Sequence, residues 1–270
     1  MKQDDNSVCR ASHNKASVAL VSVTPEADVL LVFAKRTRHM ESAQDLEAVR
    51  RLRVEDPERF AEELGYVFTT IGSSQEFVDY TFLITGVTRA FTHQLVRHRV
   101  GTSFAQQTQR ATQMTDFDYL ATGQCINKLV YHGAMARIQD SYRALLHEGV
   151  PAQDARGILP TNILTNILFK VNLRALGGIM DARLCVRAQG EFQNITYLMR
   201  KCVLSVHPWA EPLMRPFCLK HNSCLFPRFK ECAVKPHLPQ VSPEAVEGMM
   251  EIWRQQLGKD VQPTQQFKEK

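Results

Sequence analysis

The spacing of hydrophobic residues predicts alternating strands and helices in the first hundred positions. Residues 18–33 combine a short alternating stretch, a proline turn and an apolar run, which predicts a strand followed by a helix. Residues 41–65 are charged and helix-forming, and we expect their last helix to end at Gly65. Residues 77–84 alternate aromatic and β-branched side chains like a strand, and residues 87–97 have helical spacing.

The second half of the chain predicts mostly helix. Residues 129–148 and 185–206 have helical periodicity. Residues 162–180 are amphipathic and predict a third helix, with a core of Ile163, Ile167, Phe169 and Val171. From residue 236 the composition turns to proline, glutamine and lysine. We therefore expect an α/β catalytic domain over residues 1–235 and a helical, polar extension over residues 236–270.

Composition excludes several classes of protein. No apolar run approaches the roughly 20 residues of a membrane span, and the polar N-terminus has no signal-peptide pattern. We therefore expect a cytoplasmic protein without a membrane partner. The net charge is only +5, and the basic residues concentrate in two segments, which favours a small polyanion over nucleic acid. The seven scattered cysteines are interpreted as structural thiols, and no metal site is expected.

The first basic segment, residues 90–112, reads AFTHQLVRHRVGTSFAQQTQRAT. An apolar stretch ends in Arg97, His98 and Arg99, and amide and hydroxyl side chains follow. Arginine matches phosphate with a planar fork of donors and stays charged, while amides and hydroxyls suit a base edge and a sugar. The segment predicts a nucleotide site, although a solvated basic turn is the common alternative for such a triplet.

The second basic segment, residues 149–184, strengthens this interpretation. It carries Ala-Arg, Leu-Pro, an asparagine two residues after the proline, Asn-x-Arg, and a further arginine nine positions on. Together with Gln94 before the Arg-His-Arg triplet, these spacings resemble the flavin-dependent thymidylate synthases over roughly residues 65–235. The resemblance implies a central, mostly antiparallel sheet flanked by helices, and a homotetramer with active sites shared between subunits.

The resemblance also implies a reaction and its cofactor. The reaction is reductive methylation of dUMP to dTMP, with FAD as cofactor and with NADPH and methylenetetrahydrofolate as co-substrates. The implied flavin ligands are Arg97, His98, Arg99, Asn172 and Arg174. The expected substrate ligands are Gln94, Gln106, Gln107, Thr108, Arg110, Arg156 and Arg183, of which Thr108 and Arg183 are the catalytic candidates. The alternatives are a surface ion pair for each arginine, a structural role for His98 and a helix cap for Asn172.

The departures from the family pattern leave other functions open. Thr108 replaces the family serine, one extra residue precedes it, and Ala111 replaces a tyrosine. Two upstream histidines of the family are missing from residues 70–77. A reshaped pocket favours a second hypothesis, methylation of UMP to 5-methyl-UMP as in nucleoside-antibiotic pathways, because it leaves room for a 2'-hydroxyl. A third hypothesis is a non-catalytic paralogue that binds flavin or nucleotide.

Overall fold

An antiparallel sheet forms the centre of the molecule. The computed structural model describes residues 9–13, 15–38, 45–229 and 232. Within these residues, five strands pair antiparallel in the order β1-β2-β3-β5-β4. Their bounds are β1 (Cys9–His13), β2 (Ala16–Val23), β3 (Asp79–Thr88), β4 (Thr102–Gln106) and β5 (Leu164–Asn172). The antiparallel α/β architecture expected from the sequence is confirmed.

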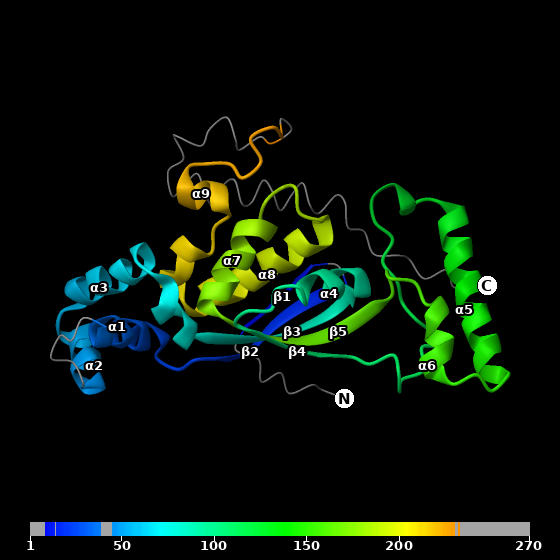
Figure 1. Cartoon of the computed structure of the whole chain (residues 1–270), viewed down its shortest axis with the longest axis horizontal. Helices are drawn as coiled ribbons and strands as arrows, with labels where there is room; N and C mark the ends of the chain where they lie inside the picture. The colour runs from blue at the N-terminus through cyan, green and yellow to red at the C-terminus, as the bar shows by residue number, and fades with distance from the viewer. Residues whose placement is uncertain (1–8, 14, 39–44, 230–231, 233–270) are drawn as a thin grey trace.

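One face of the sheet carries the two main helices, α7 (Leu173–Arg183) and α8 (Gly190–Val206) (Figure 1). Contacts join α8 to β1 and β2, and α7 to β5 and α8. Strand β5 buries every second residue beneath them, and the ring of Phe169 stacks between Phe82 and Phe104. Apolar side chains at alternate positions thus form the core between the sheet and its helices.

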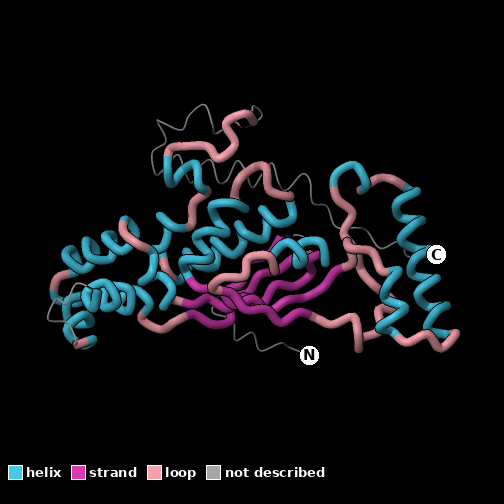
Figure 2. Tube along the Cα trace, viewed as in Figure 1, coloured by secondary structure: helices cyan, strands magenta, loops and turns pink. Residues whose placement is uncertain are grey.

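Further helices lie at the two ends of the sheet (Figure 2). At one end, α1 (Ala27–Arg38), α2 (Leu46–Glu55) and α3 (Pro57–Thr69) pack together. At the other end, α5 (Leu129–His147) packs on the short α6 (Ala152–Ala155). The remaining short elements are α4 (Arg89–Leu95), α9 (Phe217–His221), η1 (Gly72–Phe77), η2 (Gly123–Cys125), η3 (Arg156–Ile158) and η4 (Pro208–Leu213).

Several sequence predictions need correction. Residues 162–180 do not form one helix, because β5 occupies the first half and α7 begins only at Leu173. The predicted core residues are nevertheless buried, since three of them follow the period of two that a strand requires. The helix predicted from residue 185 begins at Gly190, and α3 continues through Gly65 to Thr69. The extension over residues 236–270 lies outside the described residues.

The face of the sheet opposite to α7 and α8 stays partly open. Leu168 pairs with Leu83 and Ala105 on the neighbouring strands. Its side chain points away from the buried face of β5 and is 40% exposed. Within the described residues, this chain therefore does not cover the face completely.

Candidate active site

The Arg-His-Arg triplet directly follows α4. This helix begins at Thr88, whose hydroxyl accepts a hydrogen bond from the Phe91 amide at 3.0 Å. After Leu95 the chain turns, and the amides of Arg97 and His98 donate to the carbonyls of Gln94 and Leu95 at 3.2 and 3.1 Å. The turn leaves Arg97 and Arg99 exposed and His98 half-buried. Neither of these two guanidiniums has a hydrogen-bond or ion-pair partner within the described chain.

His98 contacts the end of the second basic segment. Arg183, the last residue of α7, places its Nε 3.4 Å from Nε2 of His98. The Arg183 guanidinium lies over the Phe192 ring, 4.4 Å from its centroid, and the His98 ring meets the edge of the same ring. Burial, and then the positive charge of Arg183, lower the pKa of His98. The imidazole is therefore neutral at neutral pH and can accept the Arg183 hydrogen bond.

Asn172 joins the same two segments through the backbone. Its amide donates to the Gly101 carbonyl at 2.9 Å, and its side-chain oxygen caps α7 by accepting from the Ala175 amide at 2.8 Å. Gly101 has a positive φ of 70°, and a Cβ at this position would lie 2.4 Å from Nδ2 of Asn172. The sequence left a helix cap open as the alternative for Asn172, and the structure shows this cap. Its contact with flavin stays a prediction.

Arg174 lies at the start of α7, at the end of the helix opposite to Arg183. Its Nη1 contacts the Glu76 carboxylate at 2.5 Å, and its side chain is 57% exposed. Glu76 belongs to η1, the segment that lacks the family histidines. The structure thus pairs Arg174 within this chain, as the surface ion-pair alternative expected.

A second group of arginines gathers around the start of α4. Arg89 donates to the Gln107 carbonyl at 3.2 Å. Burial lowers the pKa of Arg89, and the positive charge of Arg156 lowers it further, so the two guanidiniums are close to each other. Arg110 contacts the Gln153 side chain at 3.4 Å, in the helix that leads to Arg156. None of these three arginines is paired with a carboxylate in the part of the chain described.

The polar run between the triplet and Arg110 shapes the loop as well as offering donors. Gln106 turns toward α4 and donates to the Thr92 hydroxyl at 2.8 Å. The backbone amide of Gln107 donates to the backbone carbonyl of Asn166 on β5 at 3.0 Å. Thr108 is exposed, and its hydroxyl accepts from the Arg110 amide at 3.1 Å. Of these three residues, Thr108 is the freest to contact a ligand.

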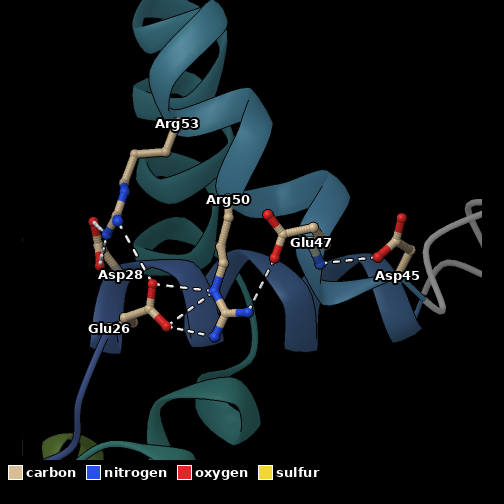
Figure 3. Close-up of polar contacts among 6 residues, drawn as sticks. All are labelled: Glu26, Asp28, Asp45, Glu47, Arg50 and Arg53. Atoms are coloured by element: carbon tan, nitrogen blue, oxygen red, sulfur yellow. Dashed lines mark hydrogen bonds and ion pairs between the residues drawn. The ribbon is translucent and has the colours of Figure 1, made fainter.

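Several arginines outside the site form ion pairs within the described residues. Figure 3 shows Arg50 and Arg53 of α2 in a network with Glu26 and Asp28 at the start of α1. Six arginines near α4 and α7 have no carboxylate partner among the described residues: Arg89, Arg97, Arg99, Arg110, Arg156 and Arg183. Close cations without counterions favour an external anion. The site can therefore hold phosphate groups.

Sequence reasoning missed two residues of this site. Arg89 was assigned no role because it lies apart from both motif segments, as the first residue of α4 and five positions ahead of Gln94. Gln189 lies in the connection between α7 and α8, and its side chain contacts that of Gln94. Arg89 carried a usable signal, since it is a cation on the helix that leads into the triplet, whereas no sequence signal marked Gln189.

Metal-ligand clusters, disulfides and membrane-spanning helices are not found within the described residues. Within the described residues, no three histidine, cysteine, aspartate or glutamate side chains lie together as metal ligands do. The seven cysteines are free thiols. None of the described helices is long and apolar enough to span a membrane.

Comparisons with known proteins lead to one family. The family model described as "Thymidylate synthase complementing protein" matches residues 19–209. The flavin-dependent thymidylate synthase of Geobacter sulfurreducens is 33% identical over 210 residues, which cover 75% of this chain and 88% of the relative. That of Sulfurisphaera tokodaii is 35% identical over 178 residues, or 63% of this chain and 69% of the relative.

Solved structures share the fold. One is the flavin-dependent thymidylate synthase of Helicobacter pylori complexed with FAD and dUMP, with a TM-score of 0.58 over 72% of this chain and 96% of that chain. Another is the UMP/dUMP methylase PolB of Streptomyces cacaoi bound with 5-Br dUMP, with a TM-score of 0.60 over 74% of this chain and 95% of that chain. At 18% identity both show the fold alone. The family model and the sequence relatives go further, and the chain belongs to the flavin-dependent thymidylate synthase family.

Proposed function

We propose that this protein is an FAD-dependent methyltransferase that methylates C5 of a uracil nucleotide and converts dUMP to dTMP. The observation that carries the proposal is the set of six arginines without carboxylate partners in the described residues, arranged at the two ends of α4. Seven helical residues separate the two groups by roughly 10 Å. Family membership gives these cations their expected ligands.

The residues of the Arg-His-Arg triplet fit a flavin nucleotide. Arg97 and Arg99 are exposed and have no partner within the described chain, so both guanidiniums can donate to phosphate oxygens. We assign FAD binding to Arg97, His98 and Arg99, with Asn172 and Arg174 at the edge of the site. Because Asn172 caps α7 and Arg174 contacts Glu76, we expect smaller contributions from these two.

The group at the start of α4 fits the phosphate of the substrate nucleotide. Arg110 contacts Gln153, which lies three positions before Arg156, and Arg89 is close to Arg156. An incoming phosphate relieves the repulsion between the arginines and receives charge-assisted hydrogen bonds, worth about 1.5–3 kcal/mol each. Gln107 and Thr108 border this group and are assigned to the sugar.

The pyrimidine ring is assigned to the other end of α4, beside Gln94 and Arg183. Arg183 is half-buried against Phe192 and hydrogen-bonded to a neutral His98. A partly desolvated cation next to the ring stabilises negative charge on a uracil carbonyl oxygen, and charge held there makes C5 nucleophilic toward the carbon donor. Arg183 therefore takes the electrostatic role, while Gln94 orients the ring by hydrogen bonding. Gln106 contacts the middle of α4 through Thr92.

The carbon and the reducing equivalents come from outside the chain. When bound, FAD would supply the hydride that completes the methyl group, with NADPH as reductant and methylenetetrahydrofolate as carbon donor. The protein residues bind the nucleotide, orient its ring and hold charge near the carbonyl oxygens.

The test is release of the C5 hydrogen from dUMP and from UMP, measured side by side with FAD, NADPH and methylenetetrahydrofolate. Release from dUMP is the expected result. Faster release from UMP would replace the proposed substrate by the ribonucleotide, a possibility that Thr108, Ala111 and the extra loop residue raise. Release from neither nucleotide by the FAD-loaded protein would refute the reaction and favour a non-catalytic paralogue.

We also propose a homotetramer with shared active sites. The partly open sheet face around Leu168 supports contact with another copy, because burying apolar side chains away from water stabilises an interface. Mass in solution tests this directly, and a fully active monomer would contradict it.

A further inference from the structure

Two segments of the site run alongside each other and touch through four side-chain pairs. One segment contains Thr88, α4 and the triplet, and the other runs from the last residue of α7 into the first turn of α8. The pairs are Thr88 with Glu191, Phe91 with Phe192, Gln94 with Gln189, and His98 with Arg183. Two of the pairs contain residues assigned above to the site, namely Gln94, His98 and Arg183. In a third pair, Phe192 packs against the Arg183 guanidinium. The first pair, at the start of α4, has no assigned role.

Glu191 makes this first pair with both of its oxygens. One carboxylate oxygen accepts from the Thr88 amide at 2.7 Å, and the other accepts from the Thr88 hydroxyl at 2.5 Å. The same hydroxyl accepts from the Phe91 amide, so Thr88 caps α4 and contacts α8 at once. A carboxylate has only acceptors and can satisfy two donors, whereas a glutamine side chain offers a single acceptor oxygen.

The charge of Glu191 is costly for the fold. Glu191 is only 4% exposed. Burial raises the pKa of Glu191, and the two Thr88 hydrogen bonds offset this only in part. No cation contributes to that balance within the described chain. A buried carboxylate without a cation lowers stability, so its presence needs a reason other than stability.

We propose that Glu191 is a positioning residue for the nucleotide site, and that its carboxylate fixes the start of α4 so that Gln94 and His98 meet Gln189 and Arg183. The inference rests on the function proposed above. Substrate contacts made by Gln94 and Arg183 depend on the relative placement of their two segments. Loss of the Thr88 contact at one end of the helix shifts the other end and weakens both contacts together.

A positioning role and a purely structural role of Glu191 predict different results for Glu191→Gln. A structural role predicts that Glu191→Gln lowers the Tm and leaves nucleotide affinity unchanged. The positioning role predicts the opposite, because the substitution removes the cost of burying a charge but also removes the second acceptor for Thr88. The expected result is a Tm no lower than that of the unmodified protein, and a dUMP KM and Kd about tenfold higher.

Glu63→Gln is the matched control. Glu63 of α3 forms an ion pair with Arg36 of α1 at 2.6 Å, and its side chain is 12% exposed. Its pKa is lowered by the Arg36 hydrogen bond, so loss of this charge is expected to lower the Tm. The pair lies in the α1–α3 cluster and outside the site, and the dUMP KM and Kd should not change.

The experiment uses the full FAD-loaded chain and measures Tm, the dUMP KM from C5 hydrogen release, and the dUMP Kd by calorimetry. Thr88→Val, which removes the hydroxyl, should raise the Kd as Glu191→Gln does, and Thr88→Ser should restore it. A Kd within twofold of the unmodified protein for both Glu191→Gln and Thr88→Val would overturn the inference. If dUMP binds without hydrogen release, the proposed reaction fails while the Kd comparison still decides the role of Glu191.

Discussion

Replacing Gly101 with alanine should destabilise the protein by about 2–3 kcal/mol, from two sources. Gly101 lies between the triplet and β4 with φ at +70°, in the left-handed region. An alanine there costs about 1–2 kcal/mol. Its Cβ would also lie 2.4 Å from the Asn172 side chain, and moving that side chain gives up a helix cap worth about 1 kcal/mol.

The assay is thermal unfolding of Gly101→Ala beside Gly123→Ala. Gly123 also has a positive φ, of 56°, but a Cβ there meets nothing within 4 Å. It therefore measures the backbone cost alone. For a chain of this size, 2–3 kcal/mol lowers the Tm by roughly 5–10 °C, and the control should lose about half of that.

A double-mutant cycle identifies the cause. If the Asn172 cap is the second source, Asn172→Ala and Gly101→Ala together should cost less than the sum of the two single changes. Each single change loses the cap, whereas the double variant loses it once and no longer has the Asn172 side chain that the new Cβ would meet. Equal Tm losses for Gly101→Ala and Gly123→Ala, or strictly additive losses in the cycle, would refute the reasoning.

Three further predictions concern charge. Arg156→Ala should raise the dUMP KM by about 10–100-fold through loss of a charge-assisted contact, whereas Arg143→Ala, which removes an exposed ion-paired cation, should leave it unchanged; similar values for both would argue against the phosphate site. NMR titration should find the pKa of His98 below its usual value and higher in Arg183→Gln, since burial and the Arg183 charge both lower it; an unchanged pKa would disprove the contact. The free energy of unfolding should be higher for Glu191→Gln than for the unmodified protein at neutral pH, and the two values should converge below about pH 4.5. The reason is that the raised pKa of Glu191 lets the folded state keep a proton that the unfolded state loses as pH rises. A difference in the free energy of unfolding that persists at low pH would contradict this.

Local patterns in the sequence predicted the elements that local physics decides. Helix α5 was predicted nearly to the residue, because its apolar spacing and Gly149 mark its length and end. Strand β5 was read as a helix, since Leu173 onward continues the apolar pattern and the change from a period of two to 3.6 falls inside one run. Strand β4 was missed because its polar residues resemble a loop, and only pairing with β5 makes it a strand.

In the site, too, local sequence patterns predicted some features, while contacts between distant segments decided the others. Its arginines were found from motif spacing, and the structure leaves most of them without carboxylates in the described residues. The contacts that join the two segments were not predictable. Glu191 and Thr88 are 103 positions apart, and neither the buried carboxylate nor the Gln94–Gln189 pair leaves a local pattern. Asn172 and Arg174 matched the motif, and the sequence also offered a helix cap for Asn172, which the structure shows; the partner of Arg174, Glu76, came only from the structure.

The central claim is that two basic segments, far apart in sequence, form one nucleotide and flavin site. A crystal structure of the FAD-loaded protein with dUMP tests it most directly. The account predicts the dUMP phosphate within hydrogen-bonding distance of Arg110 and Arg156, the pyrimidine beside Arg183, and the flavin nucleotide against Arg97 and Arg99. A dUMP molecule bound away from both ends of α4 would contradict it.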